Sequence, residues 1–261
     1  MRRFLFAALA RAGGLLLTTS PLMGQSKPVL VPDVSQRSVE IAYSFTGADL
    51  LLFGAILYPG GRRPERDRPT DVVVVVKGPT ESILMREKEK VAGIWVNAAS
   101  LRYRSAPSFY AIASSRPVDR LVDERTRAIY ELGLGSLQLS PASNAPANEQ
   151  DRFSRGLVAL KRRAGLYYEA PRAVEITDGV LYRARVTIPA RVPVGRFTAE
   201  TFLIRDGRVL AAAVRDIDIR KSGFERFVAR AADRSSILYG LVAVALSVGL
   251  GWFAGWVAGR R

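Results

Sequence analysis

The chain has 261 residues, of which 48% are hydrophobic and 24% charged, a balance typical of a protein that folds rather than of a disordered chain. It contains neither cysteine nor histidine. These absences exclude disulfide frameworks, thiolate zinc sites and cysteine nucleophiles. Hydrolases of the Ser-His-Asp type, zinc peptidases and histidine phosphorelays are excluded with them, because each needs an imidazole.

The formal net charge of +15 is spread along the chain rather than gathered in one basic block. Part of it lies in the terminal segments, and the remaining arginines alternate with acidic residues. This pattern predicts a solvated surface first and attraction to anionic lipid headgroups second. Binding to nucleic acid is not expected of an exported domain.

Residues 1–24 are predicted to be a secretory signal peptide. Arg2 and Arg3 form its basic start, and a mostly apolar stretch follows that is interrupted by Arg11. Small residues come next, so cleavage is expected near Gly24.

The segment after the signal has the pattern of buried strands, because β-branched runs stand between Gly and Pro residues. The expected strands are Val39–Phe45, Leu50–Tyr58, Asp71–Lys77, Ile94–Val96 and Phe109–Ala113. Gly61–Thr70 is charged and rich in proline, so it is predicted to be an exposed loop.

Residues 118–165 change to a helical period and are predicted to be an insertion of two helices. The first covers Val118–Leu132, with one apolar side made of Leu121, Val122, Ile129 and Leu132. After a loop at Gly133–Asn148, the second helix presents Phe153, Leu157 and Leu160 and ends before Gly165.

Two hairpins are predicted in the next segment, because Asp178-Gly179 and Asp206-Gly207 stand between strand-like runs and tolerate the positive φ angles of tight turns. We therefore expect a mainly β fold. Residues 25–221 would form an antiparallel immunoglobulin-like sandwich with the helical insertion. Two packed subdomains are the alternative.

A transmembrane helix is predicted at residues 237–258, where no Asp, Glu, Lys or Arg occurs. About 22 residues suffice to cross a hydrocarbon core of roughly 30 Å. Trp252 and Trp256 towards one end and Tyr239 near the other suit the two interfaces. Residues 222–236 before it are amphipathic, which predicts a stalk or a helix that lies on the membrane surface.

The orientation follows from the signal rather than from the charges that flank the helix. More arginines precede the helix than follow it, which would favour a cytoplasmic domain, but an upstream signal commits the chain first. The domain is therefore predicted to lie in the periplasm, anchored in the cytoplasmic (inner) membrane, with residues 259–261 as a cytoplasmic tail.

No motif of a phosphate-binding loop, a dinucleotide fold or a serine hydrolase occurs in the sequence. We predict no catalytic residue, no cofactor and no metal site. Asp216 and Asp218 fall on one face of an expected strand, where a polar outer face explains them as well as a cation site does. Arg102 and Arg104 are the arginine cluster that could recognise an anion.

Small residues recur every fourth position in the predicted membrane helix, at Ser247, Gly251, Gly255 and Gly259. Such a stripe allows a second helix to approach closely. It predicts a membrane-protein partner, although glycine is also common in membrane helices generally.

Several short motifs resemble the putative alphaproteobacterial transmembrane protein family. They are Pro32-Asp33-Val34-Ser35, the strand Val39–Phe45 with Gly47-Ala48, Gly165-Leu166-Tyr167, Pro189–Phe197, Tyr239-Gly240 and Gly251-Trp252. The resemblance implies an accessory envelope protein without an established activity, associated with a permease of the sulfite-exporter type. It implies no catalytic residues.

The expected function is therefore that of a non-enzymatic binding or scaffolding module, held at the membrane and serving a membrane partner. The alternative is an envelope hydrolase that acts through carboxylates, or a sensor of an anionic ligand. The alternative requires a pocket lined by paired acids or by convergent arginines.

Overall fold

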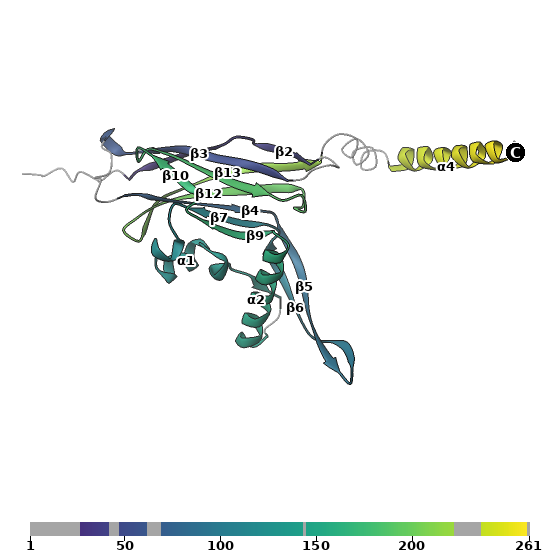
Figure 1. Cartoon of the computed structure of the whole chain (residues 1–261), viewed down its shortest axis with the longest axis horizontal. Helices are drawn as coiled ribbons and strands as arrows, with labels where there is room; N and C mark the ends of the chain where they lie inside the picture. Colours follow the sequence, from purple (N-terminus) through teal and green to yellow (C-terminus); the bar gives the residue numbers. More distant parts are fainter. Residues whose placement is uncertain (1–26, 42–46, 62–68, 143–144, 222–235, 260–261) are drawn as a thin grey trace, which may run out of the picture.

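The computed structural model describes residues 27–41, 47–61, 69–142, 145–221 and 236–259. The predicted signal peptide, most of the loop at Gly61–Thr70, the amphipathic segment 222–235 and the last two residues lie outside this range. The described part is mainly β, as predicted, and its strands form three sheets (Figure 1).

Sheet A has four antiparallel strands in the order β1-β3-β11-β10. Their bounds are β1 Val29–Val34, β3 Ala48–Leu57, β10 Val174–Thr177 and β11 Leu181–Ile188. A short 3-10 turn, η1, follows β3 at Pro59–Gly61.

Sheet B has six strands in the order β2-β13-β12-β4-β7-β9. Their bounds are β2 Ser38–Ile41, β4 Asp71–Lys77, β7 Tyr110–Ser114, β9 Tyr167–Pro171, β12 Gly195–Arg205 and β13 Arg208–Lys221. The four central strands are antiparallel, whereas the edge strands β2 and β9 run parallel to their neighbours β13 and β7.

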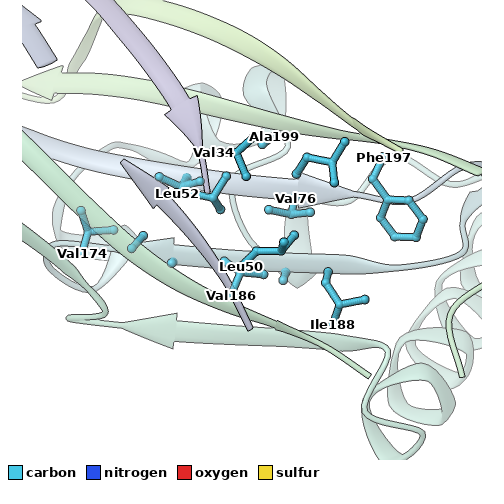
Figure 2. Packing of buried hydrophobic residues seen from close by; sticks show 14 of the residues in the cluster. Val34, Leu50, Leu52, Val76, Val174, Val186, Ile188, Phe197 and Ala199 are labelled. Carbon is cyan, nitrogen blue, oxygen red and sulfur yellow. The ribbon is translucent and has the colours of Figure 1, made fainter. Parts of the chain in front are cut away.

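Sheets A and B pack face to face over one apolar core, as Figure 2 shows for Leu50, Leu52 and Val186 against Val76 and Phe197. The alternation in the sequence explains this packing, because every second residue of β11 is buried. An immunoglobulin-like sandwich is not confirmed, since both margins of sheet B carry parallel strands. A parallel strand needs a long crossover connection, and the predicted antiparallel sandwich contained no such connection.

Strand β4 is buried on both faces. Val72, Val74 and Val76 point into the core between the sheets, whereas Val73 and Val75 belong to a second cluster. That second cluster lies under the helical insertion and includes Leu121, Val122, Leu132, Tyr110 and Tyr167. An unbroken apolar run is the sequence pattern of a strand covered on both sides.

The insertion begins with a shorter helix than predicted. Residues Val118–Leu132 are divided into a 3-10 turn, η2, at Val118–Arg120 and helix α1 at Glu124–Tyr130. Asp123 caps α1, because its Oδ1 accepts a hydrogen bond of 2.8 Å from the Thr126 amide. The predicted apolar side is wrong at Ile129, which is exposed because α1 starts a new helical phase at Asp123.

Helix α2, Ala147–Arg163, confirms the second predicted helix and buries Phe153 and Leu157. Leu160 is exposed, contrary to prediction, because Lys161, four residues after Leu157, occupies the covered position at this level of the helix. Between α1 and α2 lie a 3-10 turn, η3, at Leu134–Ser136 and the short strand β8, Ser140–Pro141.

Sheet C is a long hairpin of β5, Thr80–Val91, and β6, Ile94–Pro107, joined by β8. Only Ile94–Val96 of it was predicted. In β5, every second residue from Glu81 to Glu87 is partly covered, and the other residues are exposed. The charged run at residues 86–90 made this period-two alternation unrecognisable in the sequence. The two predicted Asp-Gly turns are confirmed, with positive φ at all four residues.

The C-terminal helix α4 covers Ser236–Ala258, so the predicted helical segment is present. Among the described residues, no helix qualifies as long and apolar enough to cross a membrane.

Candidate functional site

The predicted packing stripe lies on α4 with open space around its two central glycines. A Cβ atom added at Gly251 or Gly255 would meet nothing within 4 Å outside the helix. The hydroxyl of Ser247 donates a hydrogen bond of 2.9 Å to the carbonyl of Ala243, so this donor is satisfied within the helix. The fourth position, Gly259, would bring a Cβ atom to 3.2 Å from the Gly255 carbonyl.

Of the two acids considered for a cation site, Asp216 and Asp218, only Asp218 is held by arginines. Asp218 accepts a hydrogen bond of 2.6 Å from Arg220 and lies 4.0 Å from Arg196, while Asp216 is exposed. Across the described ranges, no group of three or more His, Cys, Asp or Glu residues could hold a metal ion. The arrangement is that of a polar outer strand face.

Arg102 and Arg104 lie on the exposed face of β6, away from the side that Leu101 and Tyr103 bury against α2. Arg104 donates a hydrogen bond of 3.2 Å to the carbonyl of Ala142. The two arginines share a face of the hairpin, and neither of them lines the cleft along α2 or the cleft beside Lys77.

The structure brings together a polar cluster that the sequence did not reveal. Nζ of Lys77, at the end of β4, lies 2.7 Å from Oε2 of Glu131 and 3.3 Å from Oε2 of Glu200. The second carboxylate oxygen of Glu131 accepts the amide of Gln138 at 3.0 Å. Each partner is half-buried, and one ammonium group pairs with two carboxylates that come from different elements.

Tyr110 completes this cluster beneath the insertion. Its hydroxyl donates to the Glu131 carbonyl at 2.6 Å and accepts the Gly133 amide at 3.0 Å. Burial raises the pKa of Tyr110 well above its usual range, and the charge of Glu169 adds to the shift. Nearby, Glu169 accepts the Leu134 amide at 2.6 Å, which holds the loop after α1 against β9.

A cleft of about 400 Å³ opens beside Lys77, Glu131 and Glu200 and has Tyr130 and Phe202 in its wall. The two carboxylates are the nearest match to the paired acids that a carboxylate hydrolase needs. Both are engaged by the same ammonium group, so ion pairs link the insertion to sheet B at this point.

A larger cleft of about 930 Å³ runs along α2. Its wall combines apolar residues such as Leu137 and Val158 with the cations Arg155 and Arg162, and Asp151 is its one acidic residue. Arg155 donates to the Asp151 carbonyl at 3.3 Å, and the exposed Arg162 lies about two helical turns further along. This cleft can accept an anion with an apolar part.

Neither cleft was predicted from the sequence. Lys77 and Glu200 lie on strands, and Glu131 follows a helix, so no spacing in the chain relates them. The one available signal was Lys77 itself, a charged residue directly after five consecutive valines.

A family model described as putative transmembrane protein (Alph_Pro_TM) matches residues 29–260. The chain belongs to this family. The match runs from β1 through α4, so the sheets, the insertion and the C-terminal helix all belong to the family's common sequence. The description of the Alph_Pro_TM family is that of a membrane protein, and the resemblance inferred from the short motifs is confirmed. No curated protein matches the chain significantly.

Proposed function

We propose that this member of the Alph_Pro_TM family is a membrane-anchored binding or scaffolding protein that serves a partner in the same membrane. Helix α4 carries the proposal: its 23 residues include no Asp, Glu, Lys or Arg. Large apolar side chains such as Leu241, Val248 and Leu250 are more than half exposed along it. Such a surface is unfavourable in water and favourable in hydrocarbon.

The proposed arrangement places the three sheets in the periplasm, α4 across the cytoplasmic membrane and residues 259–261 in the cytoplasm. Its support is the basic and apolar start of the chain, the apolar helix near its end and the family description. Fusions of alkaline phosphatase and of green fluorescent protein after Arg220 and after Arg261 test it. Phosphatase activity at Arg220 with fluorescence at Arg261 is expected, and the reverse pattern would refute the orientation.

The partner is proposed to contact the stripe Ser247, Gly251, Gly255 and Gly259. Because added side chains at Gly251 and Gly255 meet no other part of the described chain, their substitution changes a surface and leaves the fold intact. The test is Gly251→Leu with Gly255→Leu in a pull-down of the full chain from detergent-solubilised membranes. Loss of a co-purifying membrane protein is expected.

A matched control lies on the opposite side of the same helix. Ala245→Leu with Gly249→Leu adds only one carbon atom less, about half a turn away, and it should keep the partner. Equal recovery of the partner with both pairs of substitutions would rule out the stripe as the contact.

Sensing of an anionic ligand is a second candidate function, favoured by the cleft along α2. Arg155→Ala with Arg162→Ala should abolish binding of inorganic sulfate or phosphate measured by calorimetry. Arg163→Ala with Arg191→Ala removes two exposed arginines outside the cleft and should leave binding unchanged. No heat of binding by the unaltered chain would exclude this second function.

A further inference from the structure

The hairpin of β5 and β6 ends in a cluster of exposed apolar side chains. The exposed fraction is 53% for Val91, 68% for Ile94, 64% for Trp95 and 41% for Val96. They surround a two-residue turn, Ala92-Gly93, in which both residues have positive φ. A turn of this kind could consist of polar residues alone, so four large apolar side chains at a solvent-exposed tip indicate a contact surface.

The register of the hairpin separates two faces at the tip. Lys90 is paired with Trp95 and Lys88 with Asn97, and directly paired residues project from the same face. This face therefore combines one tryptophan with two lysines. Val91, paired with Ile94, and Glu89, paired with Val96, lie on the other face.

The hairpin is held in place at its base by helix α2. Lys161 pairs with Glu81, Arg152 lies 3.0 Å from Glu87, and the hydroxyls of Tyr103 and Ser154 are 2.9 Å apart. These links extend from the base of the hairpin to Glu87, and β5 continues beyond it to Val91. The hairpin beyond these links therefore projects as a supported arm (Figure 1).

The arm continues the ribbon that β4 and β7 form in sheet B. Between the two parts, the Gly78 amide donates to the Phe109 carbonyl at 2.8 Å and the Ser108 amide donates to the Pro79 carbonyl at 2.9 Å. The pairing is thus unbroken from the body to the tip. A side chain at Gly78 would approach Ser108 Oγ to 2.5 Å, so the bend at this point requires glycine.

The arm leaves sheet B at the same end as the chain that leads to α4. Lys77 at the end of β4 is opposite Thr198 of β12, and Thr198 is opposite Asp216 of β13. Strands β4 and β13 run in the same direction, and β13 continues past this level to Lys221. From there the chain proceeds through residues 222–235 to α4.

The length of the arm and the length of the connection to α4 allow the hairpin tip and the start of α4 to reach the same membrane surface. A strand of 12 residues such as β5 spans roughly 40 Å. The connection through residues 222–235 could span up to roughly 50 Å. Both the arm and the start of α4 can therefore reach a surface that lies beyond this end of sheet B.

We propose that the tip of the β5–β6 hairpin enters the headgroup region of the anionic membrane that holds α4. The indole ring of Trp95 favours the membrane–water interface, and the apolar side chains of Ile94 and Val91 can lie below the headgroups. Lys88 and Lys90 can pair with lipid phosphates. The inference rests on the proposed anchoring by α4. It adds a second membrane contact, which orients the clefts of the helical insertion relative to the bilayer.

The three tryptophans allow both contacts to be measured in the full chain. Trp252→Phe with Trp256→Phe leaves Trp95 as the single emitter, and Trp95→Phe with Trp252→Phe leaves Trp256. Each variant is reconstituted into phosphatidylcholine vesicles containing phosphatidylglycerol, with and without brominated acyl chains. Blue-shifted emission of Trp95 that bromine quenches is the expected result.

Charge reversal at the tip adds a matched comparison. Lys88→Glu with Lys90→Glu should lower the quenching of Trp95 at least about twofold, because each cation near an anionic surface contributes to binding. Arg172→Glu with Arg208→Glu makes the same change in charge at the opposite end of sheet B and should leave the quenching unchanged.

The outcomes separate the two proposals. Quenching of Trp256 without quenching of Trp95 overturns the hairpin contact and leaves the anchor intact. Quenching of Trp95 without Trp256 supports the hairpin contact and refutes anchoring by α4, whereas quenching of neither refutes both. Blue-shifted Trp95 emission that bromine does not quench would mean burial against protein, such as a second copy of the chain, and would also overturn the inference.

Discussion

Strands β4 and β5 are successive parts of one hydrogen-bonded ribbon, yet their surroundings are opposite. In β4, alternate valines enter two separate apolar clusters, one between the sheets and one under the helical insertion. In β5, one face is partly covered by α2 near the base and both faces are exposed towards the tip. Both strands pair antiparallel within the ribbon, β4 with β7 and β5 with β6, and β4 also pairs with β12 on its other edge.

The difference shows that strand pairing and burial are separate determinants in this protein. Pairing continues wherever two extended segments meet in register, whereas stability depends on what covers each face. We therefore expect substitutions in the β4 half of the ribbon to alter folding and those in the β5 half to alter contacts. The following experiments test that contrast.

The largest effect is expected from Val74→Asp. Val74 is fully buried between the sheets, so the substitution places a carboxylate in the core without a partner. The cost of at least about 4 kcal/mol approaches the whole stability of an ordinary domain. Thermal unfolding of the full chain in detergent, followed by circular dichroism, measures it.

The matched substitution at the tip is Val91→Asp, which makes the same chemical change at an exposed site. Its effect on the free energy of unfolding should be within about 0.5 kcal/mol. Similar losses at both positions would contradict the contrast between the two halves of the ribbon.

A smaller effect is expected from Lys77→Ala, which leaves Glu131 and Glu200 without their shared cation. Because both carboxylates are still partly solvated, we expect a loss of about 1–2 kcal/mol. Chemical denaturation measures it, and Lys88→Ala at the exposed arm is the control. If Lys88→Ala destabilised the chain as much as Lys77→Ala, the ion pairs of Lys77 would not be what links the helical insertion to sheet B.

High pH should weaken the same region through Tyr110. Its folded pKa is raised above the unfolded value of 10.0, so the unfolded state releases the proton first. The stability that this difference provides is complete below pH 10 and is lost as the pH rises from 10 towards the folded pKa. Unfolding midpoints measured on both sides of pH 10 should fall less in Tyr110→Phe than in the unaltered chain.

Two other tyrosines also have raised pKa values, so they provide an internal comparison for this experiment. Burial raises the pKa of Tyr168 to about 12, and burial also raises that of Tyr167. Tyr168→Phe should therefore remove a separate part of the alkaline destabilisation. An unchanged pH dependence in both variants would show that neither hydroxyl contributes.

The smallest effect is expected from Tyr103→Phe, which removes the hydroxyl bonded to Ser154 at 2.9 Å. A loss of about 1 kcal/mol is typical of one such hydrogen bond. We expect it as faster amide hydrogen exchange in β5 and β6, with unchanged exchange in β4 and β12. Faster exchange throughout the chain would mean that the arm and the body unfold together.

Much of the fold could be predicted from the sequence where the pattern is local. The five valines of β4, the two Asp-Gly turns and the apolar stretch of α4 each act through their own residues, and each is present as the expected element. The helical insertion was predicted in outline, but the cap at Asp123 divided its first part and left Ile129 exposed.

The candidate site was less predictable, because its residues meet only through sheet pairing. Lys77, Glu131 and Glu200 come from three elements, and their convergence depends on the register of β4 with β12 and on the turn after α1. Strand β2 overlaps the predicted strand Val39–Phe45, but the parallel pairing of β2 and β9 was unpredictable, since the pairing of distant segments leaves no local signal.

The sequence by itself determined the mainly β class, the absence of thiol and imidazole chemistry, and the apolar C-terminal helix, because these follow from composition and short-range periodicity. Only the tertiary structure decided the mixed pairing of sheet B, the clefts of the insertion and the end of the sheet from which the hairpin projects. Those features depend on contacts between residues far apart in the chain, where no spacing rule relates one partner to the other.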